Sequence, residues 1–210
     1  MTWSWITSNG AQIWQYTRDH AFLGIASALI GLAISLPLGI AAARWRWLYP
    51  PVLTAVNVIY AIPALALFVV FIPSLGLTDT NVIVALTLYS LCVIVPNVVA
   101  GLHAVPVPVR QAATAMGYGA LRRLVTVELP LATPVVIAGL RVAMVSSISL
   151  ASIGQLIGVS SLGYFFIDGE QRDFPTEIIV ALVLIIALAV ACDVVLVGVR
   201  RALTPWVART

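Results

Sequence analysis

The chain has 210 residues, of which 61% are hydrophobic and only 9% are charged. A soluble domain carries roughly 25% charged residues. A globule of this size could not hide so much apolar surface from water, so the composition excludes a soluble domain and a disordered chain. The net charge is +3 and all 11 basic residues are arginines. They form no basic stripe with interleaved aromatic residues, so nucleic acid is not expected as a partner.

Five long apolar stretches follow one another along the chain. A membrane-spanning helix needs about 20 apolar residues, so we predict an all-α membrane protein with five transmembrane helices. The expected spans are residues 21–43, 52–72, 81–102, 134–154 and 177–199. They form one transmembrane domain, 21–210, which follows an extracytoplasmic tail, 1–20, with aromatic residues typical of a membrane interface.

The arginines predict how these spans are oriented. Arginine clusters follow the first, third and fifth spans, whereas most acidic residues lie in the other loops. Because cytoplasmic loops are rich in arginine and lysine, we expect the N-terminus outside and the C-terminus inside a bacterial or archaeal plasma membrane. The alternative for the N-terminal aromatics is an irregular, weakly ordered tail.

Small residues recur at every fourth position of the first span, namely Ser27, Gly31, Ser35 and Gly39. Such a stripe allows the backbone of another helix to approach closely. We expect it to pack within one subunit, with a dimer seam as the alternative.

Segment 103–133, between the third and fourth spans, is the most informative part of the chain. Pro108 suits a first helical turn, alanines follow, and Gly117 or Gly119 suits the end of a helix. This pattern predicts a short helix outside the membrane, which could dock into a groove of a partner or lie on lipid as a linker. We expect Pro130 to end the segment, because the residue before a proline avoids the helical region.

The same segment resembles the coupling loop of ABC importer permeases, whose usual pattern is Glu-Ala-Ala-x3-Gly-x9-Ile-x-Leu-Pro. Here it reads Gln111-Ala112-Ala113, then Gly117, then Val127-Glu128-Leu129-Pro130, so that Gln111 and Val127 depart from the pattern. The resemblance extends over about 21–206 and is closest to permeases for glycine betaine, choline or carnitine. Methionine-importer permeases share a similar loop, so a methionine or amino acid importer is the alternative.

This resemblance implies a type I importer permease fold and a set of partners. Two such permeases, identical or paralogous, would line one path, a cytoplasmic ATPase dimer would drive it, and an extracytoplasmic binding protein would deliver the solute. The residues expected to contact the ATPase are Gln111, Ala112, Ala113, Thr114, Ala115, Met116, Gly117, Tyr118, Arg122 and Arg123. The chain has no Walker A motif, so we expect no cofactor here and ATP with Mg²⁺ in the ATPase.

Two charged residues lie well inside predicted spans, Arg141 and Asp193. Charges inside a membrane are costly, and at about 1.5 Å per residue both lie roughly 10 Å from the cytoplasmic helix ends. Their equal depth predicts an intramembrane ion pair. Snorkelling of each side chain to the interface and a role in the pore are the alternatives.

A quaternary ammonium solute offers no N–H donors, so aromatic faces must recognise it. The candidates for a substrate path inside the spans are Tyr60, Phe68, Phe71 and Tyr89, and those near the outer mouth are Tyr164, Phe165 and Phe166. The alternative is that these rings serve in packing or in the aromatic belt.

Two other classes of function fit the sequence less well. An intramembrane hydrolase would need a nucleophile and a base that face each other, but His20 and His103 are expected at opposite ends, and no paired carboxylates or metal-spaced His/Cys cluster occur. We therefore expect no catalytic or metal site and no enzymatic activity. A stand-alone channel or scaffold would not need the short surface helix.

Overall fold

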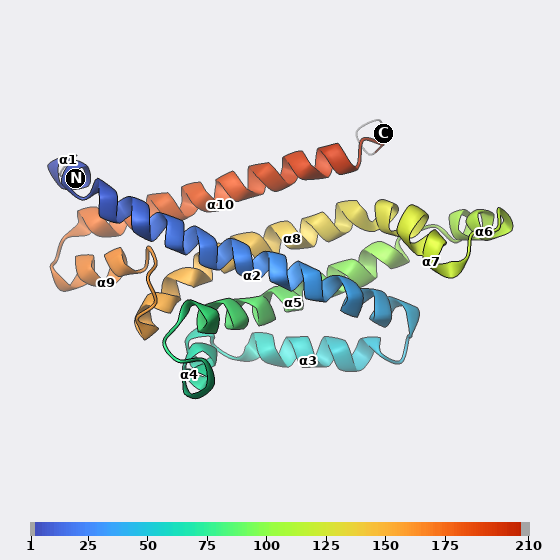
Figure 1. Ribbon diagram of the computed structural model, residues 1–210, viewed down its shortest axis with the longest axis horizontal. Coiled ribbons are helices and arrows are strands. Elements are labelled where there is room, and N and C mark those ends of the chain that lie inside the picture. Colours follow the sequence, from blue (N-terminus) through green and yellow to red (C-terminus); the bar gives the residue numbers. More distant parts are fainter. Residues whose placement is uncertain (1–2, 207–210) are drawn as a thin grey trace.

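The computed structural model describes residues 3–206 as an elongated bundle of helices (Figure 1). The long helices are α2 (Gly10–Arg44), α5 (Asp79–His103), α8 (Leu129–Ala151) and α10 (Pro175–Leu203). Shorter elements connect them: α1 (Trp3–Ser8), α3 (Tyr49–Ala61), α4 (Ala64–Leu75), α6 (Val107–Ala115), α7 (Ala120–Arg123), the π-helix η1 (Leu124–Glu128), the 3₁₀-helix η2 (Ser152–Ile157) and α9 (Tyr164–Gln171). The described residues include no strand, as the composition predicts.

Helix α5 is the centre of the bundle. It packs against α2, α3, α4 and α8, while α10 lies on α8 and α9. The small-residue stripe of α2 is buried against this core: an added β-carbon at Gly31 would lie 2.6 Å from Cβ of Ser90, and one at Gly39 would lie 2.6 Å from Cβ of Val98. The stripe therefore permits close approach of α2 and α5, which confirms packing within the subunit.

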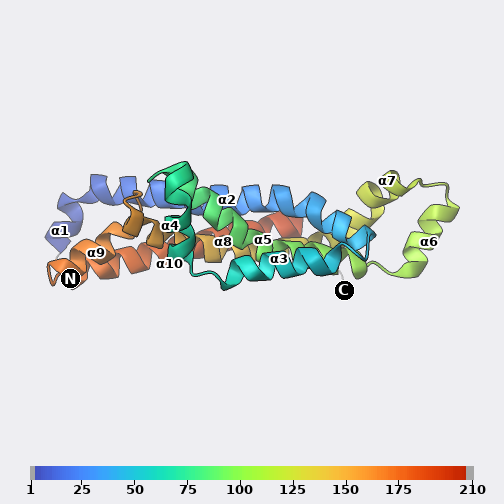
Figure 2. The same cartoon turned by 90° about the horizontal axis from the view of Figure 1, so that it is seen from below.

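The predicted second span is not one straight helix. Helices α3 and α4 meet at an angle of 97°, and Figure 2 shows α4 standing across the other helices. Pro63 lacks an N–H donor, and Ile62 before it has the extended angles φ −75 and ψ 128, as the residue before a proline prefers. The hydroxyl of Tyr89 on α5 donates to the carbonyl of Ile62, which satisfies a backbone group freed by the break.

The expectation that Pro130 ends the coupling segment is wrong. Helical structure runs from Ala120 to Ile157, and Glu128 and Leu129 have helical φ and ψ. The π-helical turn η1 resolves the conflict, because Leu129 donates its N–H to the carbonyl of Leu124, five residues back, and the wide turn makes room for the proline ring in the first turn of α8. The helix that contains the predicted fourth span therefore begins before residue 134.

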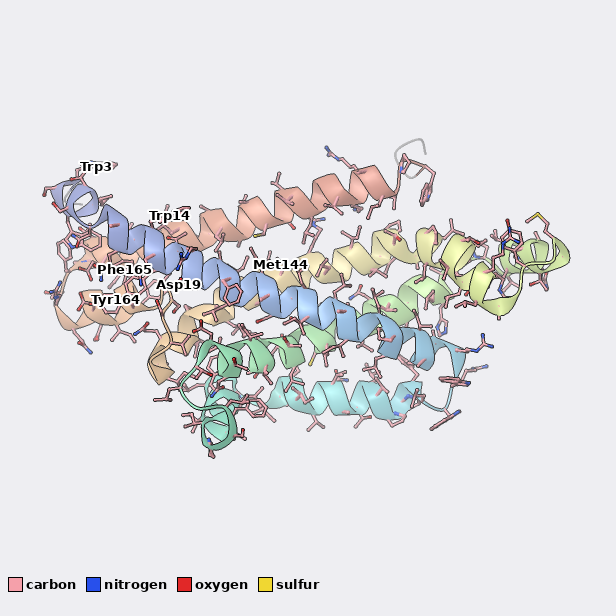
Figure 3. All side chains as sticks on the ribbon, in the orientation of Figure 1. Trp3, Trp14, Asp19, Met144, Tyr164 and Phe165 are labelled. Atoms are coloured by element: carbon pink, nitrogen blue, oxygen red, sulfur yellow. The ribbon has the colours of Figure 1, made fainter. Side chains whose placement is uncertain are left out.

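The N-terminal residues 3–8 and 10–20 are helical, so the alternative of an irregular tail is wrong for them. Trp5 on α1 and Tyr16 on α2 pack against α9: the ring centroids of Trp5 and Phe165 lie 5.7 Å apart, and those of Tyr16 and Tyr164 lie 4.9 Å apart. Figure 3 shows Tyr164 and Phe165 at the same end of the bundle as Trp3. This aromatic cluster fixes one end of the molecule, opposite the end that carries α6 (Figure 1).

Candidate functional site

The short helix predicted between the third and fourth spans is present as α6, and with α7 it extends beyond the end of the bundle in both views (Figures 1 and 2). Pro108 lies in its first turn, where the missing N–H is not needed. Gly117 has φ +83, and its N–H donates to Thr114 O at 3.0 Å while that of Tyr118 donates to Ala113 O at 3.1 Å. These two bonds form a Schellman motif, so the loop's glycine is needed for its backbone conformation.

A polar network attaches α6 to the root of α8. The Arg123 guanidinium donates to Glu128 Oε1 at 2.7 Å and to Thr114 Oγ1 at 2.8 Å. The Thr114 hydroxyl in turn donates to the carbonyl of Arg110 at 2.9 Å. One arginine therefore holds α6 to the π-helical turn below it.

Most of the predicted ATPase-contact residues are exposed. Within α6 only Ala113 is buried, whereas Gln111, Ala112 and Ala115 are exposed and Met116 is 68% exposed. Next to them, Arg122 lies over the Tyr118 ring, 4.3 Å from its centroid. The structure thus gathers the ten residues at one tip of the molecule, with a face of small side chains that a partner could approach closely.

A second feature is a cavity of about 540 Å³ at the bend between α3 and α4. Tyr60 and Tyr89 line it, with ring centroids 5.9 Å apart at an interplanar angle of 64°. Its serine hydroxyl groups come from Ser90 of α5 and from three serines of α8, Ser146, Ser147 and Ser149. None of the described residues that line this cavity is charged, so it can receive a solute by aromatic and hydroxyl contacts.

The other two aromatic candidates do not line this cavity. Phe68 is fully buried, and Phe71 packs against the same core cluster of α4 and α5. Sequence reasoning missed the α8 serines as a cavity lining. One of them, Ser147, also bonds across helices to Ser90, at 3.1 Å between the hydroxyl oxygens. Sequence reasoning also missed the backbone break, for which the Ile62-Pro63 pair was the available signal.

The two intramembrane charges lie together. Arg141 Nε donates to Asp193 Oδ1 at 2.6 Å and Arg141 Nη2 donates to Asp193 Oδ2 at 2.7 Å. This bidentate geometry is the strongest form of the contact. Both side chains are about one-third exposed, at 29% and 30%, and an open cavity of about 410 Å³ beside them also contacts Ser146. The pair therefore joins α8 to α10 at the edge of the bundle.

Known proteins are similar to this chain in sequence and in fold. Residues 35–209 match the family described as the binding-protein-dependent transport system inner membrane component. The glycine betaine/carnitine/choline transport system permease protein OpuCD of Bacillus subtilis is 36% identical over 96% of this chain and 89% of its own. The osmoprotectant import permease protein OsmW of Salmonella typhimurium is 31% identical over 96% of both chains.

Among solved structures, an inward-facing conformation of the MetNI methionine ABC transporter matches with a TM-score of 0.83 at 23% identity. The match covers 97% of this chain and 100% of that one. This likeness concerns the fold, which is that of a type I importer permease.

Proposed function

Because this chain belongs to the family of inner membrane components of binding-protein-dependent transport systems, we propose that it forms half of the translocation path of an ATP-driven importer for a quaternary ammonium osmoprotectant. It is a multi-pass membrane permease, a transport subunit rather than an ATPase. The match over residues 35–209 carries the proposal. The named relatives support osmoprotectants as the substrate class, since the methionine transporter shares only the fold.

Helix α6 is the proposed contact with a cytoplasmic ATPase dimer, which would bind ATP and Mg²⁺. Its exposed Ala112 and Ala115 let a groove approach the helix backbone closely, in the manner of helix-in-groove docking. Arg123 bonds both to α6 and to the carboxylate of Glu128. A displacement of α6 would therefore be passed to α8, whose serines line the cavity at the bend.

The cavity at the bend is the proposed part of the solute path. A quaternary ammonium group is attracted to aromatic faces, which Tyr60 and Tyr89 provide, and serine hydroxyls can donate to a carboxylate or hydroxyl of the solute. Tyr60 is 61% exposed, so a second permease subunit could complete the wall on that side. A binding protein would deliver the solute to the opposite end of the bundle from α6.

A gene deletion with complementation tests this function. Cells that lack the chain should lose energy-dependent uptake of radiolabelled choline, glycine betaine or carnitine, and a plasmid copy should restore it. An ATPase should co-purify with the tagged chain. Unchanged uptake of all three solutes together with loss of methionine uptake would contradict the substrate class, and the absence of an ATPase under stable conditions would contradict the coupling role.

A further inference from the structure

A second cavity, of about 210 Å³, lies where the ends of α2 and α5 meet the coupling segment. Its polar lining consists of Arg44 from the end of α2, His103 from the end of α5, and Arg110, Arg123 and Glu128 from the coupling segment. Its apolar lining includes Ile40, Leu102 and Leu124. The proposed transport function uses neither this cavity nor its cations Arg44 and Arg110.

The cavity carries an excess of positive charge. Glu128 is paired with Arg123 at 2.7 Å, so these two residues neutralise each other. Within residues 3–206, no acidic side chain lies within 4.0 Å of the guanidinium of Arg44 or Arg110. Arg110 is held in place by a bond to the carbonyl of Val105 at 3.1 Å. Two cations without a counter-charge favour an anionic ligand.

The neighbouring tryptophans indicate the depth of this cavity in the membrane. Trp45 and Trp47, directly after Arg44, are 51% and 74% exposed. Tryptophan concentrates at the level of the lipid headgroups, so we expect Arg44 at the height of lipid phosphates. The apolar side of the cavity, formed by Ile40 and Leu102, would then face the glycerol and upper acyl region.

We propose that this cavity binds the phosphate group of an anionic glycerophospholipid, such as phosphatidylglycerol, from the adjoining leaflet. Arg44 and Arg110 would bind the phosphate, and the apolar side chains would hold the glycerol end of the lipid. The bound lipid joins the ends of α2 and α5 to the first turn of α6. Inorganic phosphate offers the same anionic group, but it cannot use the apolar side of the cavity.

Native mass spectrometry of the detergent-solubilised full chain tests the proposal, with phosphatidylglycerol and phosphatidylcholine added in equal amounts. A basic residue at an anionic membrane surface contributes about a 5-fold gain in binding. We therefore expect Arg44→Gln and Arg110→Gln each to lower the preference for phosphatidylglycerol by about 5-fold. Arg46→Gln is the matched control, because it removes the same charge two residues from Arg44 but does not line the cavity.

Further arms separate charge from folding and lipid from phosphate. Arg44→Lys and Arg110→Lys keep the charge and should retain more of the preference than the glutamine variants do. The proposal is overturned if the glutamine variants bind phosphatidylglycerol as the unmodified chain does, if Arg46→Gln loses as much as Arg44→Gln, or if the lysine variants lose as much as the glutamine variants. Displacement of the lipid by equimolar inorganic phosphate would overturn the lipid assignment.

Discussion

The backbone of Gly117 provides a sharp test of the coupling helix. Its φ of +83 lies in the left-handed region, which costs a residue with a β-carbon about 1–2 kcal/mol. No neighbouring atom lies within 4 Å of an added β-carbon at this position, so Gly117→Ala changes only the backbone preference. That cost corresponds to a 5- to 30-fold shift in the local equilibrium toward an open Schellman motif.

Hydrogen exchange on the purified chain measures this shift directly. The amides of Gly117 and Tyr118 donate the two bonds of the motif, and their exchange should accelerate by about 5- to 30-fold in Gly117→Ala. Gly119→Ala is the matched control: Gly119 has φ −66 and equally open surroundings, so its variant should exchange as the unmodified chain does. Equal exchange in the two variants, or no acceleration in Gly117→Ala, would refute the reasoning.

Three further experiments test other parts of the structure. Gly39→Ala should lower the midpoint of thermal unfolding, because overpacking against Val98 costs about 1–3 kcal/mol. Gly198→Ala, on the open face of α10, should raise the midpoint because alanine has the higher helix propensity. A higher midpoint in both variants would contradict the packing of α2 on α5. Asp193→Asn should loosen the packing of α10 on α8 and lower the midpoint of thermal unfolding, since Arg141 loses its bidentate acceptor. An unchanged midpoint would show that the ion pair is dispensable. Tyr60→Ala should raise KM for choline uptake. Phe68→Ala should cost about 3–5 kcal/mol of stability and leave KM unchanged. An unchanged KM in Tyr60→Ala with a raised KM in Phe68→Ala would place the solute elsewhere.

Local signals in the sequence were sufficient for the helices and for α6. Apolar length defines α2, α5, α8 and α10, and Pro108 and Gly117 act within one turn of the residues that they affect. The depth of Arg141 and Asp193 also follows from counting residues along helices, and the structure brings the two side chains together.

Features that depend on contacts between several elements could not be predicted from the sequence. Because hydropathy is averaged over a window that includes Ile62-Pro63, it predicts one continuous span. The proline instead breaks the helix, and the cavity lies at this break. The residue before a proline avoids helical φ and ψ when only the two neighbours are considered. Before Pro130 the π-helical turn η1 relieves the clash, so the helix continues. The contacts of Arg123 with Thr114 and Glu128 join residues nine and five positions away, and no helical or strand period links them.

The continuous helical segment from Ala120 to Ile157 has a mechanical consequence. At about 1.5 Å per residue, these 38 residues form a rod of roughly 55 Å, long enough to reach from the tip of the bundle to its aromatic end. A tilt of a few degrees at one end of such a rod displaces the other end by several ångströms, so small rotations suffice for large movements at a distance. We expect the wide turn η1, where one residue has been added to the helical repeat, to be the point about which this rod pivots.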